Sequence, residues 1–354
     1  MTNKIPIIKV KREIKKISAT NPNLKDIVCL VGGFEKEVED PTFYETLEAA
    51  ENDLGSDTTI DANKALKEVF HEDITGVLVV DITTHTGAEG NENYSRNVTK
   101  TKLEGALNSV SQIDFDLLYV ATELTDELIT VITDASDARF EDKRPFNWVG
   151  VGTRASESAY TTTANKINDD VAAFLTQPLF VNDEELDLIE SGAYLTNLIA
   201  RLPVGNSLTA KILEEVTGLG TSYTFGAEDL GTKLVGLGFF VVRLVNPQDN
   251  TYECVNSAGP NGLDLYINRV RNYIINDFAL RKWLGEKSTP ATISGIEMEC
   301  NKLLTKFRND LGVVENITYA VEKANSNTAN VILNTIEFSD IITEIDVFVT
   351  IEVV

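Results

Sequence analysis

The chain is poor in the residues that most often build metal centres and disulfide frameworks. Its 354 residues include three cysteines and two histidines. Cys29, Cys254 and Cys300 lie far apart and form no CxxC pair, so we expect buried, reduced thiols in a cytosolic protein. Neither His71 nor His85 has a second histidine or cysteine at the spacing of metal ligands. The sequence therefore offers no support for a zinc site.

Long apolar runs and basic residues are also scarce. The nearest approach to a membrane span, residues 235–245, is short and broken by Arg243, so a buried strand explains it better. The first residues do not resemble a signal peptide. Lysine and arginine number 31 against 55 aspartates and glutamates, for a formal net charge of −24. This charge disfavours nucleic acid and anionic membranes as partners and suits a basic protein partner.

The common nucleotide and hydrolase motifs are missing. Residues 226–234, GAEDLGTKL, have the glycine spacing of a phosphate-binding loop, but Thr232 stands where that loop needs lysine. Residues 149–158 contain paired glycines without GxGxxG, which favours a turn at the end of a strand. No GxSxG elbow occurs, and His85 near Asp81 has no nucleophile partner. Catalysis is therefore not visible in the sequence.

Strands and helices alternate through the first two thirds of the chain. Short apolar runs such as residues 25–34 and 75–83 are typical of strands buried on both faces. Residues 61–72 show helical spacing, with Asp61 as the expected N-cap. We expect further strands at 115–122 and 146–153, further helices at 41–55, 101–110, 125–140 and 163–177, and a surface loop at 84–97. This alternation predicts a mostly parallel sheet.

The pattern changes near residue 245. A turn-rich stretch leads to two helices, 266–284 and 293–312, which Pro290 separates, with Gly312 suited to end the second. Strands follow at 314–323 and 329–338. We therefore predict an α/β fold, with a mostly parallel α/β core plus a C-terminal α+β domain with strand-forming N- and C-terminal arms. The predicted boundary lies near 244–250, and the parts are an N-terminal β arm (1–20), the core (21–245), the C-terminal domain (246–342) and a terminal strand (343–354).

Both ends of the chain have the alternating pattern of strands, and their charges are opposite. Residues 1–16 carry six basic residues against one acid, whereas residues 337–354 carry five acids and no base. Pro6 limits the first strand to the edge of a sheet. Such strands could join the sheet of a neighbouring copy or could pair within one fold. The residues alone leave both readings open.

The two C-terminal helices are basic although the chain is acidic. Residues 266–311 contain eight bases and five acids, a net charge of +3. Lys302 and Lys306 are spaced i, i+4 on one helix face, and Arg308 lies near the same end. The pattern predicts either a surface for an acidic partner or an ordinary solvated helix. In the second reading, the helix dipole favours bases near the C-terminus.

Most of the chain resembles a small contractile tail sheath protein of the kind found in myophages and phage-tail-like bacteriocins. The resemblance rests on the order and spacing of elements rather than on one short motif. It is carried by residues 40–55, 62–70 and 76–83, by residues 103–120 and 132–153, and most closely by residues 270–322 through the terminal strand. Residues 236–257 depart from the strand and Gly-Asn pattern that this family usually shows before its C-terminal domain.

The resemblance implies a structural protein that is not an enzyme and requires no cofactor. It implies hexameric rings stacked helically around a tail tube, with assembly in the bacterial cytoplasm before incorporation into a virion or a released particle. The implied partners are other copies of the chain, the tail tube protein, and baseplate and tail terminator proteins. The implied strand contacts between subunits are at Ile7, Val10, Arg12, Val347, Val349 and Ile351. The implied tube contacts are at Lys302, Lys306 and Arg308.

Two other functions remain open from the residues. The first is a cytosolic α/β enzyme or nucleotide-binding protein whose site follows no common motif. The second is a non-contractile oligomeric scaffold with exchanged terminal strands and no tube. Nucleotide binding would favour the first, whereas rings without a tube partner would favour the second.

Overall fold

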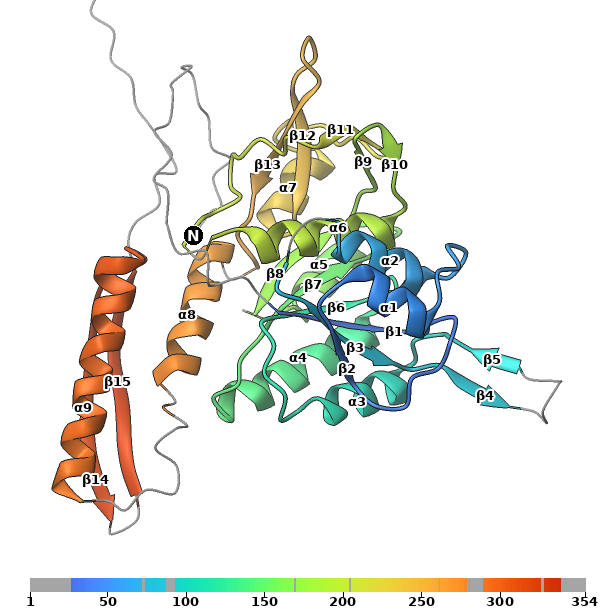
Figure 1. Ribbon diagram of the computed structural model, residues 1–354. Helices are drawn as coiled ribbons and strands as arrows, with labels where there is room; N and C mark the ends of the chain where they lie inside the picture. Colours follow the sequence, from blue (N-terminus) through green and yellow to red (C-terminus); the bar gives the residue numbers. More distant parts are fainter. Residues whose placement is uncertain are drawn as a thin grey trace, which may run out of the picture.

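The computed structural model describes most of the chain between residues 27 and 338 (Figure 1). The described residues are 27–71, 74–86, 93–168, 170–203, 205–260, 262–278, 280, 289–325 and 328–338. The predicted N-terminal arm at 1–20 and the predicted terminal strand at 343–354 lie outside them.

A mostly parallel sheet of six strands, in the order β2-β3-β1-β6-β7-β8, forms the centre of the larger part. Its parallel strands are β1 (Val28–Gly32), β3 (Val77–Asp81), β6 (Leu117–Val120), β7 (Asn147–Val151) and β8 (Val171–Leu175). The short edge strand β2 (Thr42–Tyr44) pairs antiparallel with β3. Parallel neighbours need long crossover connections, which the intervening helices supply. The predicted mostly parallel α/β core is confirmed.

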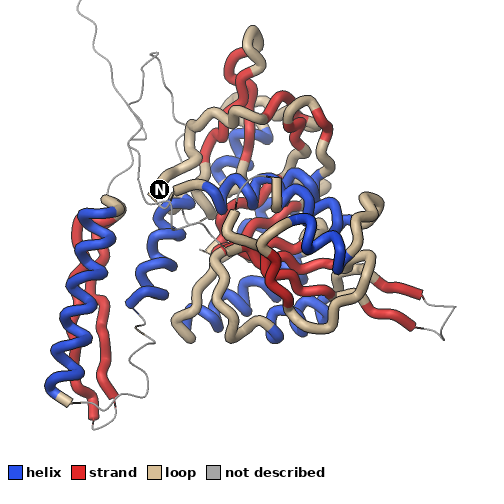
Figure 2. Tube along the Cα trace, in the orientation of Figure 1, coloured by secondary structure: helices blue, strands red, loops and turns tan. Residues whose placement is uncertain are grey.

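Helices cover both faces of this sheet, which explains why its strands are apolar on both sides (Figure 2). Alternate residues of a strand pack on opposite faces: Val28 and Leu30 belong to one apolar cluster, Cys29 and Val31 to the other. The first face carries α1 (Leu47–Leu54), α2 (Asp61–Val69) and α6 (Leu188–Arg201). The second carries α3 (Lys100–Ser109), α4 (Asp126–Glu141), α5 (Glu157–Ala164) and α7 (Leu230–Gly236).

Three small antiparallel sheets are attached to this core. They are β4 (Thr84–Thr86) with β5 (Asn93–Ser95), β9 (Leu179–Val181) with β10 (Glu184–Glu185) and β11 (Val216–Leu219), and β12 (Val241–Asn246) with β13 (Thr251–Asn256). The β12–β13 hairpin starts at the edge of the central sheet, where Phe240 N donates to Phe174 O at 2.9 Å. The β4–β5 and β12–β13 hairpins project from the body of the molecule (Figure 1).

The C-terminal part has an apolar cluster of its own. It comprises α8 (Leu265–Phe278), α9 (Pro290–Thr305), a π-helical turn (Lys306–Asp310), and the hairpin of β14 (Val314–Asn325) and β15 (Thr328–Phe338). We call these elements the C-terminal unit. Thr289 caps α9 by accepting a hydrogen bond from Thr292 N, and Gly312 (φ 64°) follows the helical stretch as predicted.

The predicted helix at residues 163–177 is wrong. α5 ends at Ala164, and the run Val171–Leu175 forms the edge strand β8. Ala172 and Ala173 favour a helix by intrinsic propensity, but this run is buried at every position. A short, wholly buried strand cannot be distinguished from a buried helix by its periodicity. Pairing with β7 decides the outcome.

Three further local predictions need correction. The helix expected at residues 41–55 begins only at Leu47, because the preceding residues form β2 and pair with β3. Asp61 is the first residue of α2 rather than its N-cap, which is Ile60. The surface loop expected at 84–97 contains the paired strands β4 and β5.

The predicted domain boundary at residues 244–250 covers the end of β12 and the turn before β13, and these two strands pair with each other. The apolar clusters divide the chain later. Leu265 belongs to a cluster of the α/β core, and Tyr266 belongs to the cluster of the C-terminal unit. The division into domains stays a prediction, and packing favours a boundary near residue 265.

Candidate assembly surfaces

The carboxyl edge of the central sheet, where α/β proteins commonly bind ligands, is closed by the chain itself. Arg96 lies directly over Gly33 at the end of β1, so that a Cβ on Gly33 would be 2.5 Å from the Arg96 carbonyl oxygen. Arg96 Nε donates to Phe34 O at 2.7 Å, and its Nη2 donates to Glu35 O at 3.1 Å. Asp81 Oδ1 accepts from Phe34 N at 3.2 Å. These contacts join the segment that follows β1 to Arg96 and to Asp81 at the end of β3.

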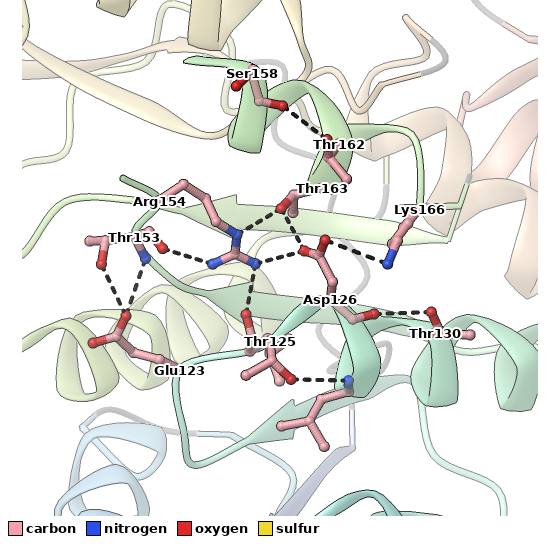
Figure 3. A network of polar contacts seen from close by, with 12 residues as sticks. Glu123, Thr125, Asp126, Thr130, Thr153, Arg154, Ser158, Thr162, Thr163 and Lys166 are labelled. Atoms are coloured by element: carbon pink, nitrogen blue, oxygen red, sulfur yellow. Dashed lines mark hydrogen bonds and ion pairs between the residues drawn. The ribbon is translucent and has the colours of Figure 1, made fainter. Parts of the chain in front are cut away.

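A second polar network seals the same edge beside β6 and β7 (Figure 3). Arg154 donates to Thr163 Oγ1 at 2.7 Å and to Leu124 O at 2.8 Å, and Thr163 donates to Asp126 Oδ1 at 2.8 Å. Burial raises the pKa of Asp126, but the Thr163 hydrogen bond and the charges of Lys166 and Arg154 outweigh burial and lower it. These ionised groups therefore join α4 to α5 instead of facing an open site.

The glycine-containing stretch at residues 226–234 does not form a phosphate loop. Gly231 lies inside α7, where a Cβ would be 2.5 Å from Thr224 O. Lys233 forms an ion pair with Glu157 at 2.9 Å. The residues before it, 222–225, form no strand. The strand–loop–helix context that a phosphate loop requires is therefore missing.

The histidines and cysteines also lack a catalytic arrangement. His85 Nδ1 is 2.9 Å from Glu37, and His71 lies between Glu68 and Glu215 at 3.5 and 3.3 Å. Burial raises the pKa of the Cys29 thiol to about 12. Within the described ranges, no three histidine, cysteine, aspartate or glutamate residues are grouped to hold a metal ion. Nor does any helix described there have the length and apolarity to cross a membrane.

Among the described residues, both edges of the C-terminal hairpin are without a neighbouring strand. β14 and β15 pair with each other from Val314 and Phe338 to Asn325 and Thr328, and no other described strand joins them. α9 lies along the hairpin, and Tyr319 Oη donates to Glu297 O at 3.4 Å. A two-stranded sheet alone is marginally stable in water, and its free edges can accept a strand from another chain. This hairpin is therefore a candidate assembly surface.

The three predicted tube-contact residues lie close together at the end of α9 but differ in their partners. Lys306 Nζ is 2.6 Å from Asp277 Oδ2, and both side chains are 30% exposed. The Lys302 side chain is 70% exposed and lies 3.8 Å from Glu299. Arg308 is exposed in the π-helical turn. Lys302 and Arg308 are thus presented to solvent, whereas Lys306 ties α9 to α8.

Comparison with solved structures identifies the architecture. The sheath tail protein of Desulfitobacterium hafniense superposes with a TM-score of 0.63 at 12% identity, over 92% of this chain and 99% of that chain. The sheath tail protein of Listeria innocua superposes with a TM-score of 0.63 at 11% sequence identity. The match covers 89% of this chain and 96% of that chain. The anti-feeding prophage helical sheath in its contracted state superposes with a TM-score of 0.63 at 12% sequence identity, and the match covers 99% of both chains. This chain has the fold of a contractile tail sheath protein.

The sheath fold extends over both parts of the molecule, because the matches cover nearly the whole of each chain. The resemblance seen in the sequence is thereby confirmed at the level of the fold. No family model matches the sequence, and no curated protein sequence matches it. At about 12% identity the likeness lies in the backbone and not in individual residues.

The structure of this sheath-like chain leaves the predicted strand contacts untested. Ile7, Val10, Arg12, Val347, Val349 and Ile351 all lie outside the described residues. The sequence did not show that β14 and β15 form a hairpin that no other described strand joins. Alternation predicted the two strands, but no local signal shows which other strands lie beside them.

Proposed function

We propose that this protein is the structural subunit of a contractile tail sheath. In this role it forms hexameric rings that stack around a tail tube, and contraction drives the tube through the envelope of a target cell. The support is the sheath fold over the full length of the chain, together with its likeness to the sheath and baseplate structures of the anti-feeding prophage. The closed carboxyl edge of the central sheet gives no support to an enzyme or nucleotide-binding function.

The sheath fold carries the proposal, and its strand-donation part rests on the hairpin of the C-terminal unit, which no other described strand joins. A strand added to β14 or β15 gains main-chain hydrogen bonds, and its alternate side chains fix the register. The donors would be the arm containing Ile7, Val10 and Arg12 and the terminal strand containing Val347, Val349 and Ile351. A contact between unlike surfaces of two copies closes into rings or continues as a helix.

The tube would be contacted through the exposed end of α9. Lys302 and Arg308 offer positive charge in a chain whose net charge is −24, which suits an acidic tube surface. Lys306 would contribute less directly, since Asp277 already neutralises it. Exposed ion pairs contribute only about 0–1 kcal/mol each, so such contacts hold an extended sheath without preventing its release.

Contraction then requires no cofactor. A signal from the baseplate would break the weak tube contacts ring by ring, while the donated strands keep neighbouring subunits tethered. The baseplate and a tail terminator would bound the sheath at its two ends. Assembly would take place in the bacterial cytoplasm, and the finished sheath would belong to a virion or to a released phage-tail-like particle.

The experiment is a proline substitution in the donated strand. Val349→Pro removes a backbone N–H and should abolish sleeves seen by negative-stain electron microscopy, while circular dichroism shows a folded chain. Val349→Thr is the matched control, because it keeps the N–H and the β-branched shape, and it should still form sleeves. Sleeves formed equally well by Val349→Pro would contradict strand donation at this position.

A further inference from the structure

Helix α8 joins the two parts of the molecule through two chemically different faces. Val270, Ile274 and Phe278 pack in the apolar cluster of the C-terminal unit. The side toward β7 and β8 is polar, and it carries Arg271 and the buried Asn272. The C-terminal unit is therefore held together by apolar packing. Leu265 at the start of α8 packs in a core cluster, and beyond it Arg271 and Asn272 join the helix to the core through polar contacts.

Asp170 is the centre of this mounting. It lies immediately before β8 and is 3% exposed. Its carboxylate accepts hydrogen bonds from Arg271 Nη2 and, at 3.4 Å, from Asn272 Nδ2, both on α8. It also accepts a hydrogen bond from Ser136 Oγ on α4. One buried carboxylate thus links a core helix, the edge strand and α8.

The surroundings of Asp170 fix its own position. Its carbonyl oxygen accepts from Trp148 N and from Asn147 Nδ2, each at 3.1 Å, so that β7 holds its backbone. The Arg271 guanidinium lies 5.3 Å from the ring centroid of Phe140 on α4. The carboxylate and its arginine are therefore each held by the core independently of their ion pair.

The start of α8 is anchored by a second carboxylate. Asp264 Oδ2 accepts from Ser207 Oγ and Thr209 Oγ1 at 2.7 Å and from Ser257 Oγ at 2.9 Å. Its Oδ1 accepts from Tyr266 N at 3.0 Å, in the first turn of the helix. This anchor fixes where α8 begins, and the Asp170 contact, almost two turns later, fixes where the helix points.

We propose that Asp170 is the positioning residue that sets the orientation of the C-terminal unit on the α/β core, so that the two move as one body. Apolar contact is non-directional and allows sliding, whereas hydrogen bonds weaken steeply when their angles change. Breaking one partner of a buried ion pair also leaves a charge without compensation. The orientation is therefore set by Asp170 and Arg271 rather than by the close approach of the Val313 side chain to Gly205.

This inference is independent of the proposed sheath role. In any assembly that uses both parts, a fixed orientation passes a displacement of the core directly to the open hairpin. An assembly whose subunits hinge at α8 would lose that transmission.

The test is a distance distribution measured by pulsed electron resonance on the full chain. Spin labels at Lys67→Cys on α2 and at Met298→Cys on α9 report the orientation, because both positions are exposed and the three native cysteines are buried. Labelled chain is diluted into excess unlabelled chain, so that only distances within one copy contribute. The parent should give one narrow distribution. Asp170→Asn should broaden or shift it, with the far-ultraviolet circular dichroism unchanged.

Two further variants keep the test decisive. Arg271→Gln removes the same ion pair from the partly exposed α8 side, and it should broaden the distribution even if Asp170→Asn does not fold. Asp126→Asn is the matched control, because it disrupts a similar network away from α8. Asp126 lies beyond the carboxyl ends of the strands, whereas Asp170 lies at the amino end of β8. It should leave the distribution unchanged. Parental distributions in both Asp170→Asn and Arg271→Gln would overturn the proposal, as would equal broadening in Asp126→Asn.

Discussion

Replacing Lys306 with glutamine should weaken the C-terminal unit without weakening its attachment to a tail tube. The ammonium group lies 2.6 Å from Asp277 Oδ2, and both side chains are 30% exposed. At an effective dielectric constant of about 20, this separation corresponds to a gross attraction of about 6 kcal/mol. Desolvation and lost side-chain entropy offset most of it, so we expect Lys306→Gln to lower the free energy of unfolding by about 1 kcal/mol.

A double-mutant cycle measures this pair directly. Urea unfolding of the parent, Lys306→Gln, Asp277→Asn and the double variant should give a coupling free energy of about 1 kcal/mol. Cosedimentation with purified tail tubes then separates stability from attachment. Lys306→Gln should cosediment like the parent, whereas Lys302→Gln and Arg308→Gln should cosediment less, with a difference that shrinks at high salt. Loss of cosedimentation in Lys306→Gln at unchanged stability would refute this reasoning.

Three further predictions concern the α/β core. Gly33→Ala should lower the free energy of unfolding in urea by about 1–3 kcal/mol, because the new Cβ would meet the Arg96 carbonyl. Gly105→Ala in α3 is the control: its new Cβ would have no atom within 4 Å, so the change should be neutral or stabilising. Cys29, buried and with its pKa raised to about 12, should resist a thiol reagent at pH 8 until the protein is unfolded. Asp126→Asn should lower stability at neutral pH, and its difference from the parent should vanish as pH falls, because a carboxyl with a lowered pKa stabilises the fold only while it is ionised.

The order of elements in the core could be predicted because the local signals agree with the tertiary structure. Residues 77–80 and 117–120 are continuous apolar runs, and the structure buries them between two helical layers. α4 begins after Thr125, whose hydroxyl accepts from Leu128 N, so its N-terminus carries an ordinary capping signal. Here propensity, periodicity and capping all favour the same element.

The two segments wrongly predicted as helical share a physical cause, which is pairing with a distant strand. Residues 171–175 become a strand because β7 lies beside them, although their alanines suit a helix. Residues 42–44 leave the helical pattern because β3 offers them an edge. Periodicity within a segment carries no information about such partners.

The candidate assembly surfaces were only partly predictable for the same reason. Charge and helical spacing indicated the exposed end of α9, but they did not show that Lys306 forms an ion pair with Asp277. The alternating pattern predicted β14 and β15, whereas their open edges follow from the absence of any third described strand beside them. Asp170 directly follows Asp169, and the sequence alone does not distinguish this pair of acids from solvated carboxylates.

The most direct test of the central claim is negative-stain electron microscopy of the full-length chain beside a chain that ends at Thr343. Removal of the terminal strand leaves every described residue in place. We expect hollow sleeves or stacked rings from the full-length chain, and dispersed particles with a folded core from the shortened one. Monodisperse monomers from both chains, or sleeves from both, would contradict the claim that this strand links neighbouring subunits.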